Sequence, residues 1–396
     1  MSLPSRITQV ELAQPSLDTV LRLCFIADSR SLHTARWLRF FSERGHSVAL
    51  VSSHPPQYGL QVDSYYPLST RSRAPATRIV KNVLEVRKAI RDFRPDVLHA
   101  HYINEFGWLG ALSGFHPFVL TAWGSDIYQA PFQSPLAGVL SPWAVRRADY
   151  VTADSDDQVE RLRTMGAGVD SSVMVTWGVD LAKFTGRTGS VWREKHGIDG
   201  CRFVVLSPRE WTPNSNIDLI IKSFAIARSE RPEMLLVLKY WKERTPLLVQ
   251  EKIAVQIASL GIKDSTLIID EEPEDILPEM FAAADVTISV CSSDGTPVSL
   301  LEAMASGSAV VVSDLPSLAE WVEEGVSGFL VGTSDAEQIA SRLTRVSDDS
   351  SLRRRLGEQA RRVIERKADR TENFERVENA YQRLVCSGSS GRRHAL

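Results

Sequence analysis

The stretch of this 396-residue chain best suited to chemistry is DGTPVSLLE, in which Asp294 and Glu302 place two carboxylates eight residues apart. A β-branched apolar run, 286–290, precedes it, and a helix-forming run follows and stops at Gly307. This pattern predicts a strand, a tight loop and a helix start. The first N–H groups of a helix lack internal partners and its dipole end is positive, so an anion can be held there while the carboxylates accept hydrogen bonds from sugar hydroxyls. Alternatively, Asp294 is only a turn residue and Glu302 a solvated helix residue.

Other polar side chains follow predicted strands. Arg209 ends the strand 203–209, where a guanidinium can pair with phosphate, although a surface arginine is the alternative. Asp126 follows the strand FVLTAW and can accept a bond from a hydroxyl or cap a helix. His99 and His101 share one face of the strand 96–102, where a structural role is the more common one.

These residues must be positioned by repeated strand–helix units. The expected strands are 21–28, 47–53, 96–102, 118–123, 150–155 and 173–180 in the first half and 203–209, 234–241, 266–270, 286–290 and 309–314 in the second. Such alternation predicts parallel, doubly wound α/β domains whose ligands bind beyond the carboxyl ends of the strands. The loop 28–33 therefore lies at the edge of a site, and it carries no glycine-rich dinucleotide fingerprint.

The length of the chain exceeds that of one ordinary core and predicts two domains. A Thr/Gly/Arg-rich linker at 185–190 gives the boundary. The division is a first domain 1–184, a second domain 185–372, a final helix 373–387 and a disordered tail 388–396. The final helix repeats Phe374, Val377, Tyr381 and Leu384 at helical spacing.

Bulk composition excludes several classes of protein. There is no apolar run of the ~18 residues that a membrane helix needs, and the first residues have no apolar signal-peptide core. A net charge of −3 argues against general nucleic-acid binding. Of four separated cysteines, Cys24, Cys201 and Cys291 lie in apolar runs and are predicted to be buried thiols, which fits a cytoplasmic location.

Two charged runs have more than one interpretation. The segment 71–94 carries Arg71, Arg73, Arg78, Lys81, Arg87, Lys88, Arg91 and Arg94. It is either a solvated helix face or a surface attracted to an anionic membrane or a phosphate-bearing acceptor, which would place the protein peripherally at the inner face of a membrane. The acidic run 271–275 is interpreted as solvated capping of the next helix.

Taken together, the motifs resemble those of the family-4 (group 1) retaining glycosyltransferases. The resemblance covers about residues 20–385 and rests on HTARWLRFFSERGHSVALVS, DVLHAH, LTAWGSD, SPR with NIDLII, and above all DGTPVSLLEAMASGSAVVVSD with LAEWVEEGVSGFLV. It implies the GT-B architecture: two Rossmann-like domains facing across a cleft, the first binding the acceptor and the second a nucleotide sugar. It also implies that the last helix crosses back to the first domain.

The resemblance also implies roles. Asp294 would contact hydroxyls of the donor sugar, Glu302 the ribose, and Arg209 the diphosphate. The implied donor-binding residues are Arg209, Asn214, Lys239, Asp294, Gly295, Thr296, Pro297, Val298, Ser299, Leu300 and Glu302, with the backbone amides of 295–299 facing the ligand. The implied acceptor-binding residues are His33, His101, Trp123, Gly124 and Asp126, and the implied catalytic residues are Arg209, Asp294 and Asp126. The nucleotide sugar is a substrate, and neither a cofactor nor a metal is implied.

The chain departs from the family pattern at three positions. Asp294 stands where a longer glutamate is usual, and the lysine expected about five residues after Arg209 is replaced by a loop offering Asn214 or Asn216, unless Lys239 or Lys242 supplies the charge. Trp123 stands where a histidine is frequent; an indole cannot accept a hydrogen bond but can stack on a ring. Two alternatives therefore stay open: a non-catalytic nucleotide-sugar-binding protein, and a GT-B sugar-nucleotide epimerase, which would need no acceptor.

Overall fold

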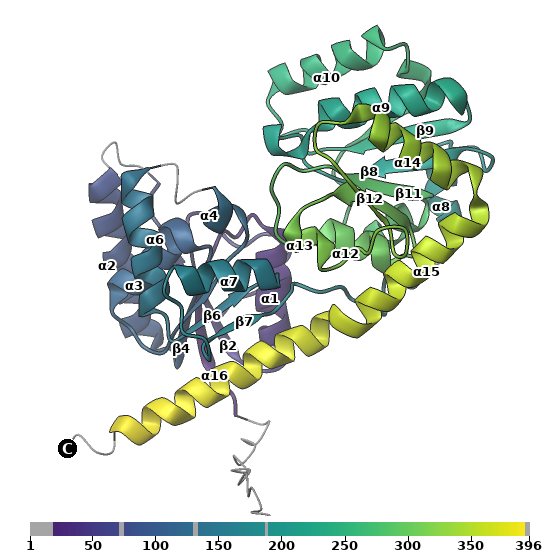
Figure 1. Cartoon of the computed structure of the whole chain (residues 1–396). Helices are drawn as coiled ribbons and strands as arrows, with labels where there is room; N and C mark the ends of the chain where they lie inside the picture. The colour runs from purple at the N-terminus through teal and green to yellow at the C-terminus, as the bar shows by residue number, and fades with distance from the viewer. Residues whose placement is uncertain (1–18, 71–74, 130–133, 187–188, 393–396) are drawn as a thin grey trace, which may run out of the picture.

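The computed structural model describes residues 19–70, 75–129, 134–186 and 189–392. Figure 1 shows two α/β domains that face each other, with the last two helices, in yellow, running along both. Each domain is built on one parallel sheet, so the predicted fold class, two Rossmann-like domains, is confirmed.

The first domain contains a seven-stranded sheet in the order β3-β2-β1-β4-β5-β6-β7. Its strands are β1 Arg22–Ile26, β2 Ser47–Ser52, β3 Ser64–Pro67, β4 Val97–His101, β5 Phe118–Thr121, β6 Tyr150–Ala153 and β7 Ser172–Met174. Its helices are α1 Leu32–Glu43, α2 Pro75–Phe93, η1 Ile103–Gly107, α3 Trp108–Ser113, α4 Ser125–Tyr128, α6 Pro135–Arg147 and α7 Asp156–Thr164. Alternate residues of β1 enter different cores, since Cys24 and Ile26 belong to one and Phe25 to the other. Apolar strands buried on both faces explain why these segments read as continuous hydrophobic runs.

The second domain contains a six-stranded sheet in the order β10-β9-β8-β11-β12-β13. Its strands are β8 Phe203–Ser207, β9 Met234–Lys239, β10 Thr266–Ile269, β11 Val286–Ser289, β12 Ala309–Ser313 and β13 Phe329–Val331. Its helices are α8 Ser190–Lys195, η2 Pro213–Ser215, α9 Ile217–Glu230, α10 Leu247–Ser259, η3 Lys263–Ser265, α11 Leu277–Ala282, α12 Val298–Ala305, α13 Pro316–Ala319, α14 Ala336–Asp348 and α15 Ser350–Lys367. In both sheets the strand order reverses beside the first strand of the domain, at β1/β4 and at β8/β11. Crevices at such switch points are where doubly wound sheets bind ligands.

The last helix, α16 Arg370–Arg392, returns to the first domain, as expected (Figure 1). Phe374, Val377 and Tyr381 are fully buried in the core beside α1. The Tyr381 hydroxyl lies 2.5 Å from Nδ1 of His99 on β4. The helix is drawn to Arg392, past the expected end at 387, while 393–396 of the expected disordered tail lie outside the described residues.

Two strands, β3 and β13, were not predicted from the sequence, and both lie at sheet edges. Strands of three or four residues at an edge carry too little apolar pattern to be recognised. The prediction for Cys201 was also wrong: it is exposed in the turn before β8, whereas Cys24 and Cys291 are buried.

Candidate active site

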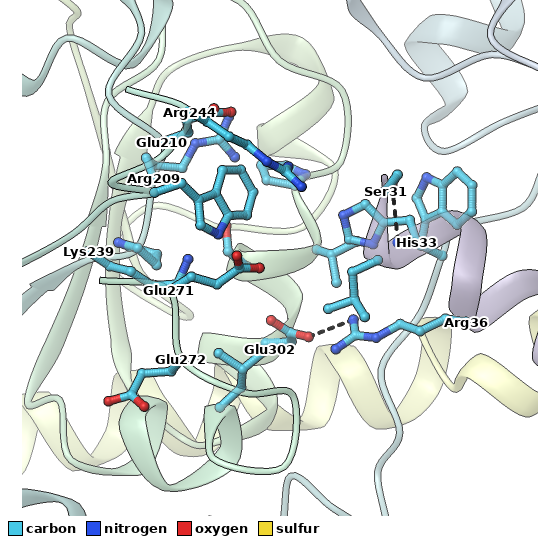
Figure 2. A pocket seen from close by; sticks show the side chains of 18 of the residues that line it. Ser31, His33, Arg36, Arg209, Glu210, Lys239, Arg244, Glu271, Glu272 and Glu302 are labelled. Atoms are coloured by element: carbon cyan, nitrogen blue, oxygen red, sulfur yellow. Dashed lines mark hydrogen bonds and ion pairs between the residues drawn. The ribbon is translucent and has the colours of Figure 1, made fainter. Parts of the chain in front are cut away.

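A cavity of about 830 Å³ lies between the two domains, lined by residues that follow the carboxyl ends of strands in both sheets. The first domain contributes Asp28 after β1 and Asp154 after β6. The second contributes Arg209 after β8, Lys239 at the end of β9 and the loop beginning at Asp294 after β11. Figure 2 shows His33 and Arg36 on one side, opposite Arg209, Glu271 and Glu302 on the other. The site is therefore built by both switch points at once.

An ion pair joins two of the predicted residues at the cavity. Nη2 of Arg209 lies 2.7 Å from Oδ2 of Asp294, and both side chains are mostly buried. Burial alone would lower the pKa of Arg209, but the charge of Asp294, together with the effects of Cys291 and Glu210, more than offsets it, and the pKa is raised above its usual range. The guanidinium stays charged at every accessible pH, so it can face a phosphate as a permanent cation.

Only part of the loop backbone is free to bind a ligand. The amide of Gly295 donates to Oδ1 of Asp294 (3.0 Å), and the amide of Thr296 donates to Oδ1 of Asp154 (3.1 Å). Pro297 has no N–H, and α12 begins at Val298. The prediction that the amides of 295–299 all face a ligand is therefore wrong for the first three residues, and only those of Val298 and Ser299 remain candidates.

Glu302 contacts an arginine that sequence analysis did not single out. Arg36 of α1 donates from Nη1 to Oε1 of Glu302 (2.9 Å) and from Nε to Oε1 of Glu274 (2.6 Å). Its side chain is only 5% exposed, so this is a buried bridge between the domains (Figure 2). Burial alone would raise the pKa of Glu274, but the nearby Arg36 holds it below its usual 4.5. The interpretation of the run 271–275 as solvated capping is thus wrong for Glu274.

A second contact between the domains is formed at the Asp294 loop. Besides the amide bond, Oγ1 of Thr296 donates to the backbone oxygen of Asp154 (2.5 Å). Burial raises the pKa of the Asp154 carboxyl well above its usual 3.8. A Cβ on Gly295 would lie 2.0 Å from Nε2 of Gln158 and 2.6 Å from Oδ1 of Asp154. Gly295 therefore allows the first domain to approach the loop, and neither it nor its neighbour Gly124 lines the cavity.

Comparison with known proteins assigns the family. Residues 22–155 match the family described as glycosyl transferase 4-like, and residues 190–363 match the family described as glycosyl transferases group 1. The chain belongs to the group 1 glycosyltransferases of GT-B architecture. The resemblance noted in the sequence is thereby confirmed.

Relatives and solved structures agree with this assignment. The chain is 28% identical over 290 residues to D-inositol 3-phosphate glycosyltransferase of Salinispora arenicola, covering 67% of this chain and 64% of the relative. It is 27% identical over 285 residues to the protein of that name from Saccharomonospora viridis, covering 68% and 66%. The match thus spans slightly less than two thirds of these relatives.

Among solved structures, HepE of Anabaena in complex with UDP-glucose has a TM-score of 0.78 at 17% identity, covering 92% of this chain and all of that one. Sucrose-phosphate synthase of Thermosynechococcus elongatus also has a TM-score of 0.78, at 15% identity and with the same coverage. These likenesses show the shared fold.

Besides Gly124, two predicted acceptor-side residues of this family member do not reach the cavity. Asp126 is fully buried and accepts from the amides of Ile103 (2.8 Å), Trp123 and Gly124 (both 2.9 Å). Burial raises its pKa to about 6, against the effect of these amides. His101 is 1% exposed among aromatic rings, and burial lowers its pKa to about 3. Both side chains lie behind the wall of the cavity and support it. The Asp126 carboxylate is needed there to satisfy buried backbone amides.

Besides Gly295, two predicted donor-side residues also lie elsewhere. Nδ2 of Asn214 donates to the oxygen of Ser293 (2.8 Å), and its Oδ1 accepts from the amide of Ser293 (3.1 Å), so this side chain holds the loop that carries Asp294. Leu300 is 2% exposed in the hydrophobic core. The other residues predicted for the donor, namely Arg209, Lys239, Asp294, Thr296, Pro297, Val298, Ser299 and Glu302, line the cavity.

Lys239 is placed where a second cation is useful. It lies at the end of β9 with its ammonium 4.7 Å from the ring centre of Trp241, which also lines the cavity. Burial lowers its pKa, while Glu271 and Glu302 oppose that shift. Within the part of the chain that the structure describes, no group of three or more His, Cys, Asp or Glu residues is placed to hold a metal ion.

His33 and Trp123 line the cavity as expected, together with Trp177, which sequence analysis missed. The ring centres of Trp123 and Trp177 are 4.8 Å apart, and those of His33 and Trp177 are 5.5 Å apart. Burial, helped by the charge of Arg36, lowers the pKa of His33 to about 3, so its ring is neutral at physiological pH. Trp177 follows the short strand β7, and nothing in its local sequence distinguished it from a core tryptophan.

Proposed function

We propose that this protein is a retaining glycosyltransferase that transfers a sugar from a nucleoside-diphosphate sugar to an acceptor hydroxyl in the synthesis of a glycan, glycolipid or glycoside. The observation that supports this most is the shared cavity, in which Arg209, Lys239, Asp294 and Glu302 meet at the strand ends of the second domain. Cations suit a diphosphate and carboxylates suit sugar hydroxyls. That the family relatives and HepE carry names or ligands of this kind adds support.

In this proposal the protein acts by positioning and electrostatics. Arg209 and Lys239 face the diphosphate and stabilise the negative charge that develops on the leaving group. Asp294, held by Arg209 and by the Asn214-braced loop, accepts from hydroxyls of the donor sugar. Glu302 offers Oε2 to the ribose while Arg36 holds Oε1. The acceptor hydroxyl attacks on the face from which the diphosphate departs, which retains the anomeric configuration, and we propose that no metal takes part.

A non-catalytic nucleotide-sugar-binding protein is the second candidate. The observation that favours it is the commitment of Asn214 to the loop at Ser293, so that this side chain supplies no contact where the family usually has a cation. Such a protein would bind the donor and release no product. An epimerase would convert the donor without any acceptor.

The deciding experiment combines binding with turnover. UDP and UDP-glucose, followed by other nucleotide sugars, are titrated by calorimetry, and products formed with an acceptor panel are followed by mass spectrometry. Proton NMR of the product gives its anomeric configuration. Donor binding with acceptor-dependent transfer and an unchanged anomeric configuration supports the proposal. An inverted anomeric configuration in the product refutes the retaining mechanism. Donor binding without turnover favours the non-catalytic nucleotide-sugar-binding protein, and an isomerised donor formed without acceptor favours the epimerase.

Peripheral attachment to an anionic membrane is proposed through α2, at the outer edge of the first domain (Figure 1). Val80 and Leu84 are 60% and 58% exposed, and Lys81 and Lys88 are exposed beside them. Arg71 and Arg73 lie outside the described residues. Basic residues flanking apolar ones suit the inner face of a membrane, where such a protein would lie in the cytoplasm. No helix in the described ranges is long and apolar enough to span a membrane.

Sedimentation with vesicles containing phosphatidylserine tests this attachment. Replacing Lys81 and Lys88 by glutamate should abolish binding that is weakened by salt. The matched control replaces Lys222 and Lys252 of the second domain in the same way, which changes the net charge equally. Equal binding of both variants would refute a role for α2.

A further inference from the structure

The positive charges that line the cavity differ in how far carboxylates compensate them. Among the described residues the arginines and lysines of the cavity are Arg30, Arg36, Arg209, Lys239 and Arg244. Arg30, Arg36 and Arg209 each have a carboxylate oxygen 2.7–2.9 Å from a guanidinium nitrogen. The ion pairs of the described residues include neither Lys239 nor Arg244. The cavity therefore contains two cations that no carboxylate directly matches, and both come from the second domain.

One indole brings these two cations to the same part of the cavity. Nζ of Lys239, at the end of β9, lies 4.7 Å from the ring centre of Trp241, and Cζ of Arg244 lies 4.8 Å from it. Trp241 and Arg244 belong to the loop between β9 and α10. Figure 2 shows Lys239 and Arg244 on the side of the pocket that also carries Arg209. Contacts of cations with an aromatic face hold the side chains in place without neutralising their charge.

The hydrogen bonds of Arg244 also leave its charge uncompensated. Its Nη2 atom donates to the backbone oxygen of Arg30 (3.1 Å) and, at a longer distance, to the hydroxyl of Tyr58 (3.4 Å). Both acceptors are neutral oxygens of the first domain. Nε and Nη1 donate to no residue that the structure describes. Since a guanidinium presents its N–H donors in a planar fork, donors remain for phosphate oxygens while Nη2 fixes the group at the cavity.

A diphosphate in this cavity needs cations of this kind. It carries more than one negative charge, and Arg209 is already matched by Asp294. A partly buried anion without a compensating cation is costly. We infer that Arg244 binds the diphosphate of the donor together with Lys239. This inference rests on the proposed function and adds a residue that the sequence motifs did not single out. Lys242, which the sequence offered for this charge, is not among the described residues that line the cavity.

Comparing a nucleoside diphosphate with its nucleoside isolates the phosphate contact. The probe is whichever of UDP, GDP, ADP, CDP or dTDP the wild type binds in calorimetry, and its nucleoside is titrated by ligand-observed NMR. Arg244→Gln keeps a polar side chain and removes the charge. We expect the Kd of the diphosphate to rise about 10- to 100-fold, because one charge-assisted contact is lost, while the Kd of the nucleoside stays unchanged.

Two further variants separate this contact from other effects of the substitution. Lys242→Gln removes the same charge from the same loop at an exposed position, and it should leave both Kd values unchanged. Arg244→Lys keeps the charge without the planar fork, so its loss of diphosphate affinity should be smaller than that of Arg244→Gln. Equal losses in Lys242→Gln and Arg244→Gln would show a general effect of net charge and overturn the inference.

The remaining outcomes distinguish the inference from the proposed function. Equal rises in Kd for the diphosphate and the nucleoside would mean that Arg244 only joins the domains through Arg30, and would overturn the inference. So would an unchanged diphosphate affinity, including the case in which only the KM of a phosphorylated acceptor rises, which would assign the guanidinium to an acceptor phosphate. In each of these cases the proposed function stands. A wild type that binds none of the five nucleoside diphosphates would overturn both.

Discussion

Replacing Arg36 by methionine tests whether the bridge between the domains holds the cavity together. Methionine keeps most of the length of the side chain and removes its charge. The change leaves Glu302 and Glu274 without the guanidinium that they share, and the two carboxylates are 6% and 24% exposed. The buried carboxylate of Glu302 then faces the carboxylate of Glu274 with no cation between the two.

The size of the loss follows from burial. Removing one partner of a buried ion pair costs about 3–5 kcal/mol, because the other charge is left buried without compensation. Since Glu274 is partly exposed, we expect the lower end, about 3 kcal/mol. In a domain of roughly 200 residues that corresponds to a fall in Tm of about 6–12 °C.

Arg39→Met is the matched control on the same helix. Nη1 of Arg39 lies 3.5 Å from Oε2 of the same Glu274, but its side chain is 36% exposed. An exposed pair of this kind contributes about 0–1 kcal/mol. Differential scanning calorimetry of both variants at pH 7 should therefore show a large loss for Arg36 and a small one for Arg39. Equal small losses would refute the buried bridge.

The pH dependence supplies an independent check on the same variant. Because the folded-state pKa of Glu274 lies below its usual 4.5, the bridge stabilises the protein above pH 4.5, and this contribution disappears as the pH falls through the lower, folded-state value. The loss of stability in Arg36→Met, relative to the wild type, should thus be full at pH 7 and smaller near pH 3. A deficit that stays constant over this range would contradict the electrostatic explanation.

Three further perturbations address other parts of the site. Glu302→Gln should weaken UDP binding by about 10- to 100-fold in calorimetry, since a charged acceptor bond is worth about 1.5–3 kcal/mol; unchanged affinity would remove Glu302 from the ribose site. Gly295→Ala, whose Cβ would meet Asp154 and Gln158, should separate the domains and raise the radius of gyration in solution scattering, whereas Gly200→Ala, with no atom within 4 Å of its Cβ, should not. His101→Leu should reduce acid lability: the folded pKa of about 3 lies below the usual 6.5, so stability is lost as the pH falls between them, by about 2 kcal/mol at pH 5. If the Tm of His101→Leu and that of the wild type fall by the same amount between pH 7 and pH 5, that reasoning is wrong.

The architecture was predictable because its signals are local. Buried parallel strands such as β8 and β9 are apolar at nearly every position, and helices such as α7 and α14 begin at a capping side chain, Ser155 and Asp335, and have helical periodicity. Residues directly after those strands, such as Arg209 and Asp294, could therefore be placed at a shared edge from topology alone. Topology could not show which polar side chains at that edge would be needed as hydrogen-bond partners of backbone amides. Asp126 was expected in the cavity, but three nearby amides needed its carboxylate.

Contacts across the cleft were invisible in the sequence because they join residues far apart in the chain. Arg36 lies in the helical run HTARWLRFF beside Trp37, on a face that packs inward, and its partner Glu274 lies 238 residues away. A charged residue on the apolar face of a helix is the one signal that could have found it, since a buried arginine needs a carboxylate. The sequence does not say which carboxylate that is, and only the arrangement of the two domains decides it.

The same contacts explain how two domains can form one site. Thr296 bonds to Asp154, Glu302 bonds to Arg36, and Glu320 accepts from the amides that begin α7. Two of these contacts lie at the ends of the 294–302 stretch that is proposed to bind the donor. A ligand that engages Asp294 and Glu302 therefore acts on residues that also hold the first domain in place. Donor binding and closure of the cleft must then be thermodynamically coupled. Any variant that opens the cleft should weaken donor binding, and the loss in binding free energy should equal the free energy that the bound donor contributes to closure.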